Sequence, residues 1–447
     1  MYAAGPMGAG QPPYALALAD VAKRGRLVVY TGAGLSRGHP TDIPAGAEVA
    51  RRCHERLVDL LGADALDGAD SSNLTSVADV VAALDGGLDL LRRTAVGVAE
   101  FTTADPNFGH EALALLLLEG LVSTITTNWD DCIERAGGAE RVLAVISDQD
   151  RQQIHAPALL KVHGCATRPD TVLLTSKDLT NPPVWVRDEI NARLADSHVV
   201  FVGIGDVAGY VRSRIEEAAE AVGAGGAIYV VSPSVDNNWD ESQWAEVLPD
   251  HPAERRFGLT ADEFLDGLAA ACVRLLLREI AEAIEEQSEA LAAFNRARGA
   301  FEVVTPLDAL RWLRACAVPR QPGHSVLRQQ SFTSALIALG VLGPDDVELH
   351  PLGRAITNGS VYEVLVGVGN ITASRCRREA ESRLIKYRSE GGDTATSPTF
   401  LVAGAVGRFT SPGGLEQSVL GDSDPRDLVS GPLTVSPTLI RAEDLAA

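Results

Sequence analysis

The chain has 447 residues, of which 46% are hydrophobic and 22% are charged, and its formal net charge at pH 7 is −21. This length suffices for two or three domains, and no apolar run approaches the ~20 residues that a membrane-spanning helix requires. The acidic charge argues against autonomous binding to nucleic acid or to an anionic membrane, because both surfaces repel a negatively charged protein. We therefore expect a soluble globular protein without a membrane partner.

The N-terminus and the cysteines indicate the compartment. The segment Met1-Tyr-Ala-Ala-Gly-Pro6 has no basic region followed by an apolar stretch, and the six cysteines show no regular spacing. A secretory signal would need the former, and a disulfide framework would show paired, patterned cysteines. A cytoplasmic location is expected.

The first predicted strand lies in the run Leu27-Val-Val-Tyr-Thr-Gly-Ala-Gly-Leu-Ser36. It ends in a tight glycine turn, where backbone N–H groups could approach a pyrophosphate without a Cβ in the way. By itself such a turn is a weak signal, since most are ordinary turns. The candidate cofactor-binding residues here are Gly32, Ala33, Gly34 and Ser36.

Three helices are predicted next, because Ala, Val and Leu recur at helical spacing over residues 43–61, 74–101 and 109–119. The last of them leads into an apolar strand over 121–126. Helices that alternate with short apolar strands are typical of a parallel sheet covered on both faces.

The second run, Ile125-Thr-Thr-Asn-Trp-Asp130, delivers polar side chains at a strand end. Doubly wound sheets bind ligands at this edge, so Thr127, Asn128 and Asp130 are candidate site residues. Asn128 and Asp130 could instead cap the helix that begins near Asp131, and the two roles are compatible.

The third run, Leu160-Lys-Val-His-Gly164, ends in His163. In an isolated segment a core histidine bonded to the backbone would be the more usual interpretation, but the order of the runs favours a catalytic base. The histidines without partners at motif spacing stay unassigned, and they are His39, His110, His155 and His198. A hairpin is predicted around 171–175, and Pro182-Pro183 opens a helix that runs to about Ala195.

The fourth run, Val199-Val-Phe-Val-Gly-Ile-Gly-Asp206, is followed by a predicted helix to about Ala221 and by the strand Ile228-Tyr-Val-Val-Ser232. Asp206 could equally be the N-cap of that helix or a direct cofactor contact. The candidate residues of this part are Gly203, Gly205, Asp206 and Ser232.

In this order the runs resemble the sirtuin (SIR2) fold over about residues 10–290, and within it the bacterial SIR2-like proteins of antiphage defence rather than the deacetylases. The resemblance implies a doubly wound Rossmann-like parallel sheet with additional helices, in which Asn128 orients the nicotinamide ribose of NAD and His163 is the base. Cleavage of the N-glycosidic bond of NAD passes through an oxocarbenium-like centre. An amide or carboxylate beside the ribose, as at Asn128 or Asp130, and a base that titrates near neutrality suit that chemistry.

Two departures from the deacetylase pattern favour hydrolysis of NAD to ADP-ribose and nicotinamide. Deacetylases carry two C-x-x-C pairs that hold zinc, and no two cysteines of this chain stand at that spacing, so no zinc is expected. Deacetylases usually carry the sequence G-I-P-D-F-R after the glycine turn. In this chain the segment Arg37–Ala45 follows the turn, and it keeps only Ile43-Pro44 of that sequence. The cysteines are Cys53, Cys132, Cys165, Cys272, Cys316 and Cys376.

A second, smaller α+β domain is predicted over 300–447, after a long amphipathic helix from Thr260 to about Arg298, where Gly299 offers a stop. Residues 305–360 resemble a winged helix at low specificity. Their basic and acidic residues balance, so interaction or assembly is favoured over DNA binding.

The leading hypothesis is an NAD hydrolase that acts as an antiphage abortive-infection effector. Such an enzyme needs control, and the family resemblance implies a homo-oligomer or a HerA-type ATPase partner. Three alternatives stay open: a subunit that senses NAD or ADP-ribose without turnover, a nuclease-like or structural subunit of a defence complex, and an NAD-dependent deacylase.

Overall fold

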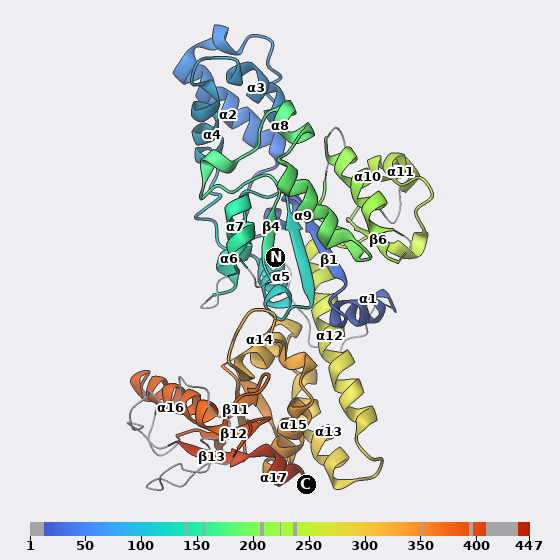
Figure 1. The fold of residues 1–447 in the computed structure, drawn as a ribbon, viewed down its shortest axis with the longest axis vertical. Helices are drawn as coiled ribbons and strands as arrows, with labels where there is room; N and C mark the ends of the chain where they lie inside the picture. Colours follow the sequence, from blue (N-terminus) through green and yellow to red (C-terminus); the bar gives the residue numbers. More distant parts are fainter. Residues whose placement is uncertain are drawn as a thin grey trace. The chain divides into compact units, whose positions relative to one another are not determined.

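The computed structural model describes residues 13–138, 142–154, 157–205, 210–223, 225–235, 239–350, 352–392, 397–407 and 437–447. These form two compact units (Figure 1), one of residues 20–268 and one of residues 269–447 with the described residues before position 20. The division falls inside helix α12 (Ala261–Ala283), earlier in the chain than the boundary expected near 290–300.

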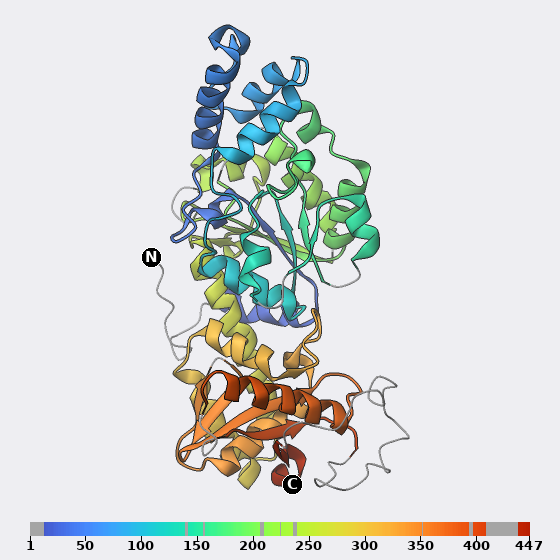
Figure 2. The same ribbon diagram turned by 90° about the vertical axis from the view of Figure 1, so that its left-hand side faces the viewer.

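The first unit is built on a seven-stranded sheet in the order β3-β4-β2-β1-β5-β6-β7, and all of its strand pairs are parallel. Helices cover both faces (Figure 2), as a doubly wound sheet requires. The predicted α/β class is confirmed. The strands are β1 (Leu27–Thr31), β2 (Val122–Thr126), β3 (Ala144–Val145), β4 (Leu159–Lys161), β5 (His198–Val202), β6 (Ala227–Val231) and β7 (Arg256–Phe257).

The register brings the ends of the four central strands to one edge of this sheet. Thr31 at the end of β1 pairs with Thr126 of β2 on one side and with Val202 of β5 on the other, and Thr126 pairs with Lys161 of β4. The chain order reverses around β1, since β2 lies on one side of it and β5 on the other. Ligands bind open α/β sheets at such a reversal, beyond the carboxyl ends of the strands.

One of the helices predicted for this unit is divided into two in the structure. The single helix expected over 74–101 is wrong, because α3 (Leu74–Ala82) ends before α4 (Gly87–Gly97) begins. Gly86 adopts a left-handed backbone with φ 66°, and a Cβ on Gly87 would lie 1.9 Å from the carbonyl oxygen of Val81. The glycine pair therefore makes a turn that lets the two helices pack against each other. Together with α2 (Gly46–Leu61) they form a small helical cluster with its own apolar core.

The connection between β4 and β5 is helical. Instead of the hairpin expected at 171–175, it has a 3₁₀ turn, η3 (Pro169–Thr171), and α8 (Ser176–Thr180), whose first turn is capped by the Thr175 hydroxyl. The predicted helix after Pro182-Pro183 is confirmed as α9 (Val184–Leu194). The remaining helices that precede α12 in the chain are α1 (Pro13–Lys23), α5 (Phe108–Leu118), α6 (Cys132–Ala136), α7 (Asp148–Gln153), α10 (Tyr210–Val222) and α11 (Gln243–Val247).

The second unit contains a mixed sheet in the order β13-β12-β11-β10-β9, with β8 paired to β11. Strands β9 to β11 are antiparallel, and α16 (Ala373–Ser389) then crosses over to β12, which is parallel to β11. The extra α+β domain is thus present, and the segment 305–360 forms part of this larger sheet domain. The other elements are α13 (Glu289–Glu302), α14 (Pro306–Cys316), β8 (Ala317–Val318), α15 (Ser331–Leu342), β9 (Glu348–His350), β10 (Arg354–Thr357), β11 (Ser360–Gly367), β12 (Thr399–Ala403), β13 (Thr438–Arg441) and α17 (Ala442–Ala446).

The long helix expected from Thr260 to Arg298 is wrong, because α12 and α13 are separate. Gln287 has φ 62°, which no helix accommodates, and the Ser288 side chain accepts the N–H of Leu291 to begin α13. That helix continues past Gly299 to Glu302, since one glycine inside a helix costs only about 1 kcal/mol. No helix of the described residues is long and apolar enough to cross a membrane.

Candidate functional site

The glycine turn after β1 packs directly against the turn after β5. Gly32 N–H donates to the carbonyl oxygen of Val202 at 3.1 Å, and Gly34 N–H donates to that of Gly203 at 2.8 Å. A Cβ on Gly34 would lie 2.7 Å from Gly203 Cα, and Gly203 itself has φ +67°. These glycines therefore serve the contact between two turns, and the N–H groups of Gly32 and Gly34 are engaged within the protein. The exposed Ala33 begins the 3₁₀ turn η1 (Ala33–Arg37).

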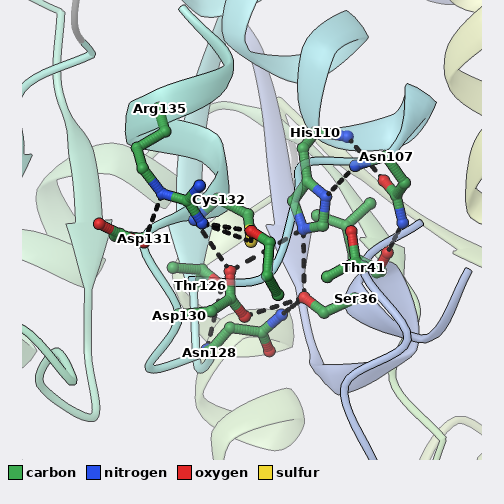
Figure 3. Close-up of polar contacts among 12 residues, drawn as sticks. Ser36, Thr41, Asn107, His110, Thr126, Asn128, Asp130, Asp131, Cys132 and Arg135 are labelled. Atoms are coloured by element: carbon green, nitrogen blue, oxygen red, sulfur yellow. Dashed lines mark hydrogen bonds and ion pairs between the residues drawn. The ribbon is translucent and has the colours of Figure 1, made fainter. Parts of the chain in front are cut away.

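Ser36, at the end of that turn, is the centre of a buried hydrogen-bond network (Figure 3). Its Oγ donates to Asp130 Oδ2 at 2.9 Å, accepts from Asn128 Nδ2 at 2.9 Å and lies 3.1 Å from His110 Nε2. All four side chains are buried, and Ser36 is 1% exposed. Three of the predicted site residues are thus brought together, from the segments after β1 and β2.

His110 is a site residue that the sequence analysis missed. It lies in the first turn of α5, where the Asn107 side chain accepts the N–H of His110 at 3.1 Å and Asn107 N–H donates to His110 Nδ1 at 3.2 Å. Burial lowers the pKa of His110 to about 4, against the attraction of Asp130, so the ring is neutral at pH 7. The available signal was the spacing of Asn107 and His110, which is that of a capping box with histidine in the third helical position.

Asp130 both joins the network and starts the next helix. Its Oδ1 accepts the N–H of Cys132, the first residue of α6, at 3.2 Å, while its Oδ2 accepts the Ser36 hydroxyl. Asn128 N–H donates to the Thr126 hydroxyl at 3.1 Å, and its side chain turns to Ser36. Asp130 therefore takes the role at the helix start that the sequence indicated, and its contact with a ribose stays a prediction.

A buried ion pair stabilises the segment after β2 that carries Asp130. Lys161 on β4 is 1% exposed, and its Nζ lies 3.1 Å from Glu134 Oε1 and also donates to the backbone oxygen of Asp130. Burial opposes the charged amine, but the attraction of Glu134 outweighs it and raises the pKa of Lys161. The lysine thus ties the segment after β2 to the strand that carries His163.

His163 emerges from β4, next to the end of β2. Val162 N–H donates to the Thr126 carbonyl at 3.0 Å, so Asn128 and His163 each follow the paired residues Thr126 and Lys161 by two positions. Gly164 has φ +83°, and a Cβ there would lie 2.3 Å from the Thr171 carbonyl oxygen. Glycine is therefore required directly after the candidate base.

The His163 side chain lines a small pocket with Arg214 of α10 and several apolar side chains. Burial, reinforced by the positive charge of Arg214, lowers the pKa of His163 to about 4, below the near-neutral value that the sequence analysis expected of the base. The imidazole is therefore neutral at pH 7 and able to accept a proton. Arg214 Nη2 donates to the Leu179 carbonyl at 3.0 Å, and its guanidinium pairs with Glu217. Arg214 was not predicted, because a basic residue on the helix after the fourth run carries no spacing signal of its own. The apolar lining is Val162, Leu173, Leu179, Pro182, Val186 and Ile190.

The other predicted residues lie along the same edge of the sheet. Thr127 N–H donates to the Thr31 carbonyl at 3.1 Å, which continues the pairing of β1 and β2. Gly205 is exposed after β5, and Ser232 follows β6, where its N–H donates to Phe257. Asp206 lies outside the described residues.

One cluster of the described residues brings potential metal ligands together, since donor atoms of His110, Asp130 and Cys132 lie within 4.8 Å of one another. However, His110 Nε2 is directed at Ser36, and Arg135 Nη2 lies 3.6 Å from Cys132 Sγ. Burial raises the pKa of the Cys132 thiol, which disfavours the thiolate that a metal needs. This donor set fits a hydrogen-bond network better than a metal ion.

Comparison with known proteins identifies a domain that includes part of the candidate site. Residues 122–248 match the family model described as the SIR2-like domain, and this range includes Asn128, Asp130 and His163. Ser36 and His110 precede it. The comparison with curated proteins found no match to the chain. A SIR2-like domain implies an NAD-related activity, in agreement with a parallel sheet whose polar strand ends meet at one edge. The chain therefore contains a SIR2-like domain.

Proposed function

We propose that the chain is an NAD hydrolase that forms ADP-ribose and nicotinamide, with Asn128 and Asp130 at the nicotinamide ribose and His163 as the base. The observation that carries this proposal is the convergence of Ser36, Asn128 and Asp130 at the ends of β1 and β2, beside the strand end that bears His163. The SIR2-like domain supports NAD as the substrate.

The hydrogen bonds of Asn128 suit a ribose contact. Its Nδ2 is committed to Ser36, and Oδ1 has no hydrogen-bond partner among the described residues, so Oδ1 is available to accept from a ribose hydroxyl. The Asp130 carboxylate lies next to it. A fixed negative charge here would stabilise the positive charge that develops at the ribose as the glycosidic bond breaks.

The neutral His163 imidazole would take the proton of a ribose hydroxyl or of water. In the overall step the bond from C1′ of the ribose to the nicotinamide nitrogen breaks, and its electron pair stays with nicotinamide. The oxygen of water forms the new bond to C1′ and gives up its proton, which gives ADP-ribose.

A role as an antiphage effector is part of the proposal. Depletion of NAD harms the host, so we expect activity to be controlled by assembly, either of copies of this chain or with a HerA-type ATPase. The mixed-sheet unit, which lies beyond the matched region, is the natural place for such contacts. The absence of a structural zinc stays a prediction.

The test is nicotinamide release from NAD by the purified full-length chain, alone and with a neighbouring-gene ATPase. Wild type would be compared with Asn128→Ala and His163→Ala, and with the matched controls Asn191→Ala on the exposed side of α9 and His350→Ala on β9. Turnover lost in the first two variants and kept in the controls would support the hydrolase. Full turnover in either of the first two would refute that residue's role.

An absence of turnover under every condition, together with retained binding of NAD, would favour the sensor instead. A deacylase would be revealed by removal of an acyl group from lysine that depends on NAD.

A further inference from the structure

His110 contacts the network from a helix that precedes the matched region (Figure 3), and its ring is fully buried. We infer that His110 is a positioning residue that fixes the orientation of the Asn128 amide through the hydroxyl of Ser36. This inference rests on the proposed function, because it assigns a role at the same site. His110 itself would touch neither the ribose nor water.

The hydroxyl of Ser36 has one hydrogen and two lone pairs but three partners. The Asp130 carboxylate only accepts, and it receives the Ser36 hydrogen at 2.9 Å. The two lone pairs of Ser36 Oγ are then left for the two nitrogen donors, Asn128 Nδ2 at 2.9 Å and His110 Nε2 at 3.1 Å. Each atom of the network therefore has one role.

This arrangement requires a particular tautomer of His110, with hydrogen on Nε2 and a bare Nδ1. The backbone N–H of Asn107 supplies the reason, since it donates to Nδ1 at 3.2 Å. The Asn107 side chain is itself held, because its Nδ2 donates to the carbonyl oxygen of Leu35 at 2.8 Å, next to Ser36. The first turn of α5 and the turn after β1 thus set the tautomer together.

The consequence reaches Asn128. Ser36 Oγ accepts a hydrogen bond from His110 and donates its own hydrogen to Asp130, so only a lone pair of Oγ faces the Asn128 amide. Asn128 must then direct Nδ2 at Ser36 and Oδ1 away from it. A flipped amide would place Asn128 Oδ1 against Ser36 Oγ, and two acceptors form no hydrogen bond. The oxygen that we assign to the ribose is oriented before any substrate arrives.

A double-mutant cycle on NAD hydrolysis tests this role. We expect His110→Leu and Ser36→Ala each to lower kcat about 10- to 100-fold through misplacement of the reacting groups, with a much smaller change in KM. Because His110 acts through Ser36, the double variant should have the kcat of Ser36→Ala alone. His110→Gln, which keeps a donor towards Ser36, should retain more activity than His110→Leu. His350→Leu, at an exposed position of β9, is the control substitution.

If the fold-losses in kcat of the two single variants multiplied in the double variant, the inference would be overturned. His110 would then act independently of Ser36. A second measurement does not depend on turnover: nitrogen-15 NMR of the imidazole in the full-length chain. It should show the neutral tautomer with hydrogen on Nε2, and His110→Leu should shift the side-chain amide signals of Asn128. Hydrogen on Nδ1, or unchanged Asn128 signals, would overturn the inference even if the chain hydrolyses NAD. If the spectra were as expected but the chain did not hydrolyse NAD, only the proposed function would be refuted.

Discussion

Gly34 and Gly203 lie in backbone contact, with the Gly34 N–H donating to the Gly203 carbonyl oxygen at 2.8 Å. The turns after β1 and β5, which are far apart in the chain, are therefore packed together at the edge where the polar strand ends gather. Any side chain between them would separate the two turns and move Ser36.

Gly34→Ala is expected to destabilise the protein. Its Cβ would lie 2.7 Å from both Cα and O of Gly203, and backbone atoms cannot rotate away, so we expect a loss of about 1–3 kcal/mol in the free energy of unfolding. Urea unfolding measures it. Gly299→Ala is the matched control, because no atom lies within 4 Å of its Cβ and the helix interior should gain up to about 1 kcal/mol. Equal stability of Gly34→Ala and wild type would contradict the close contact.

Lys161→Met should be more damaging, because it leaves the carboxylate of Glu134 buried without its partner at 3.1 Å. Removal of one member of a buried pair costs about 3–5 kcal/mol. Adding Glu134→Leu should restore much of that loss, since an apolar pair replaces an uncompensated charge. Thermal and urea unfolding of the single and double variants give the comparison. If the double variant were less stable than Lys161→Met, the pair would not be the cause.

The stability of the protein should fall as the pH is lowered from about 6.5 towards 4. The folded state lowers the pKa of both His110 and His163 to about 4 from 6.5, so in this range the unfolded chain binds more protons than the folded one. Each histidine then removes about 1.4 kcal/mol per pH unit from the free energy of unfolding. His163→Gln should reduce this pH dependence, as urea unfolding at several pH values would reveal. An unchanged slope would mean that His163 is not held neutral.

Arg214→Met should move the acid limb of the pH–rate profile of NAD hydrolysis to higher pH. The guanidinium disfavours the imidazolium form of His163, so its removal raises the pKa of the base, although burial still keeps it below 6.5. Arg212→Met, on the same helix but in exposed ion pairs, is the control. If the acid limb of Arg214→Met lay at the same pH as in the wild type, the role of Arg214 would be limited to its hydrogen bonds to the carbonyl oxygens of Leu179 and Thr180.

The local pattern of apolar runs was sufficient to predict the sheet. Strands such as Leu27–Thr31 are buried on both faces and read as continuous apolar segments, and the polar residues that follow mark their ends. For the same reason the sequence alone places Asn128, Asp130 and His163 at one edge of the sheet. Errors arose where backbone conformation decides, at Gly86 and at Gln287, since a left-handed residue ends a helix that side-chain periodicity would continue.

What the sequence alone determined was therefore the α/β class, the strands and the candidate residues at their ends, because periodicity and strand-end chemistry are local properties. The tertiary structure decided which of these residues touch. His110 joins Ser36 across 74 positions, Arg214 of α10 lines the same pocket as His163, and the glycines of two distant turns pack together. Such contacts depend on strand order and register, which bring together segments that share no local pattern.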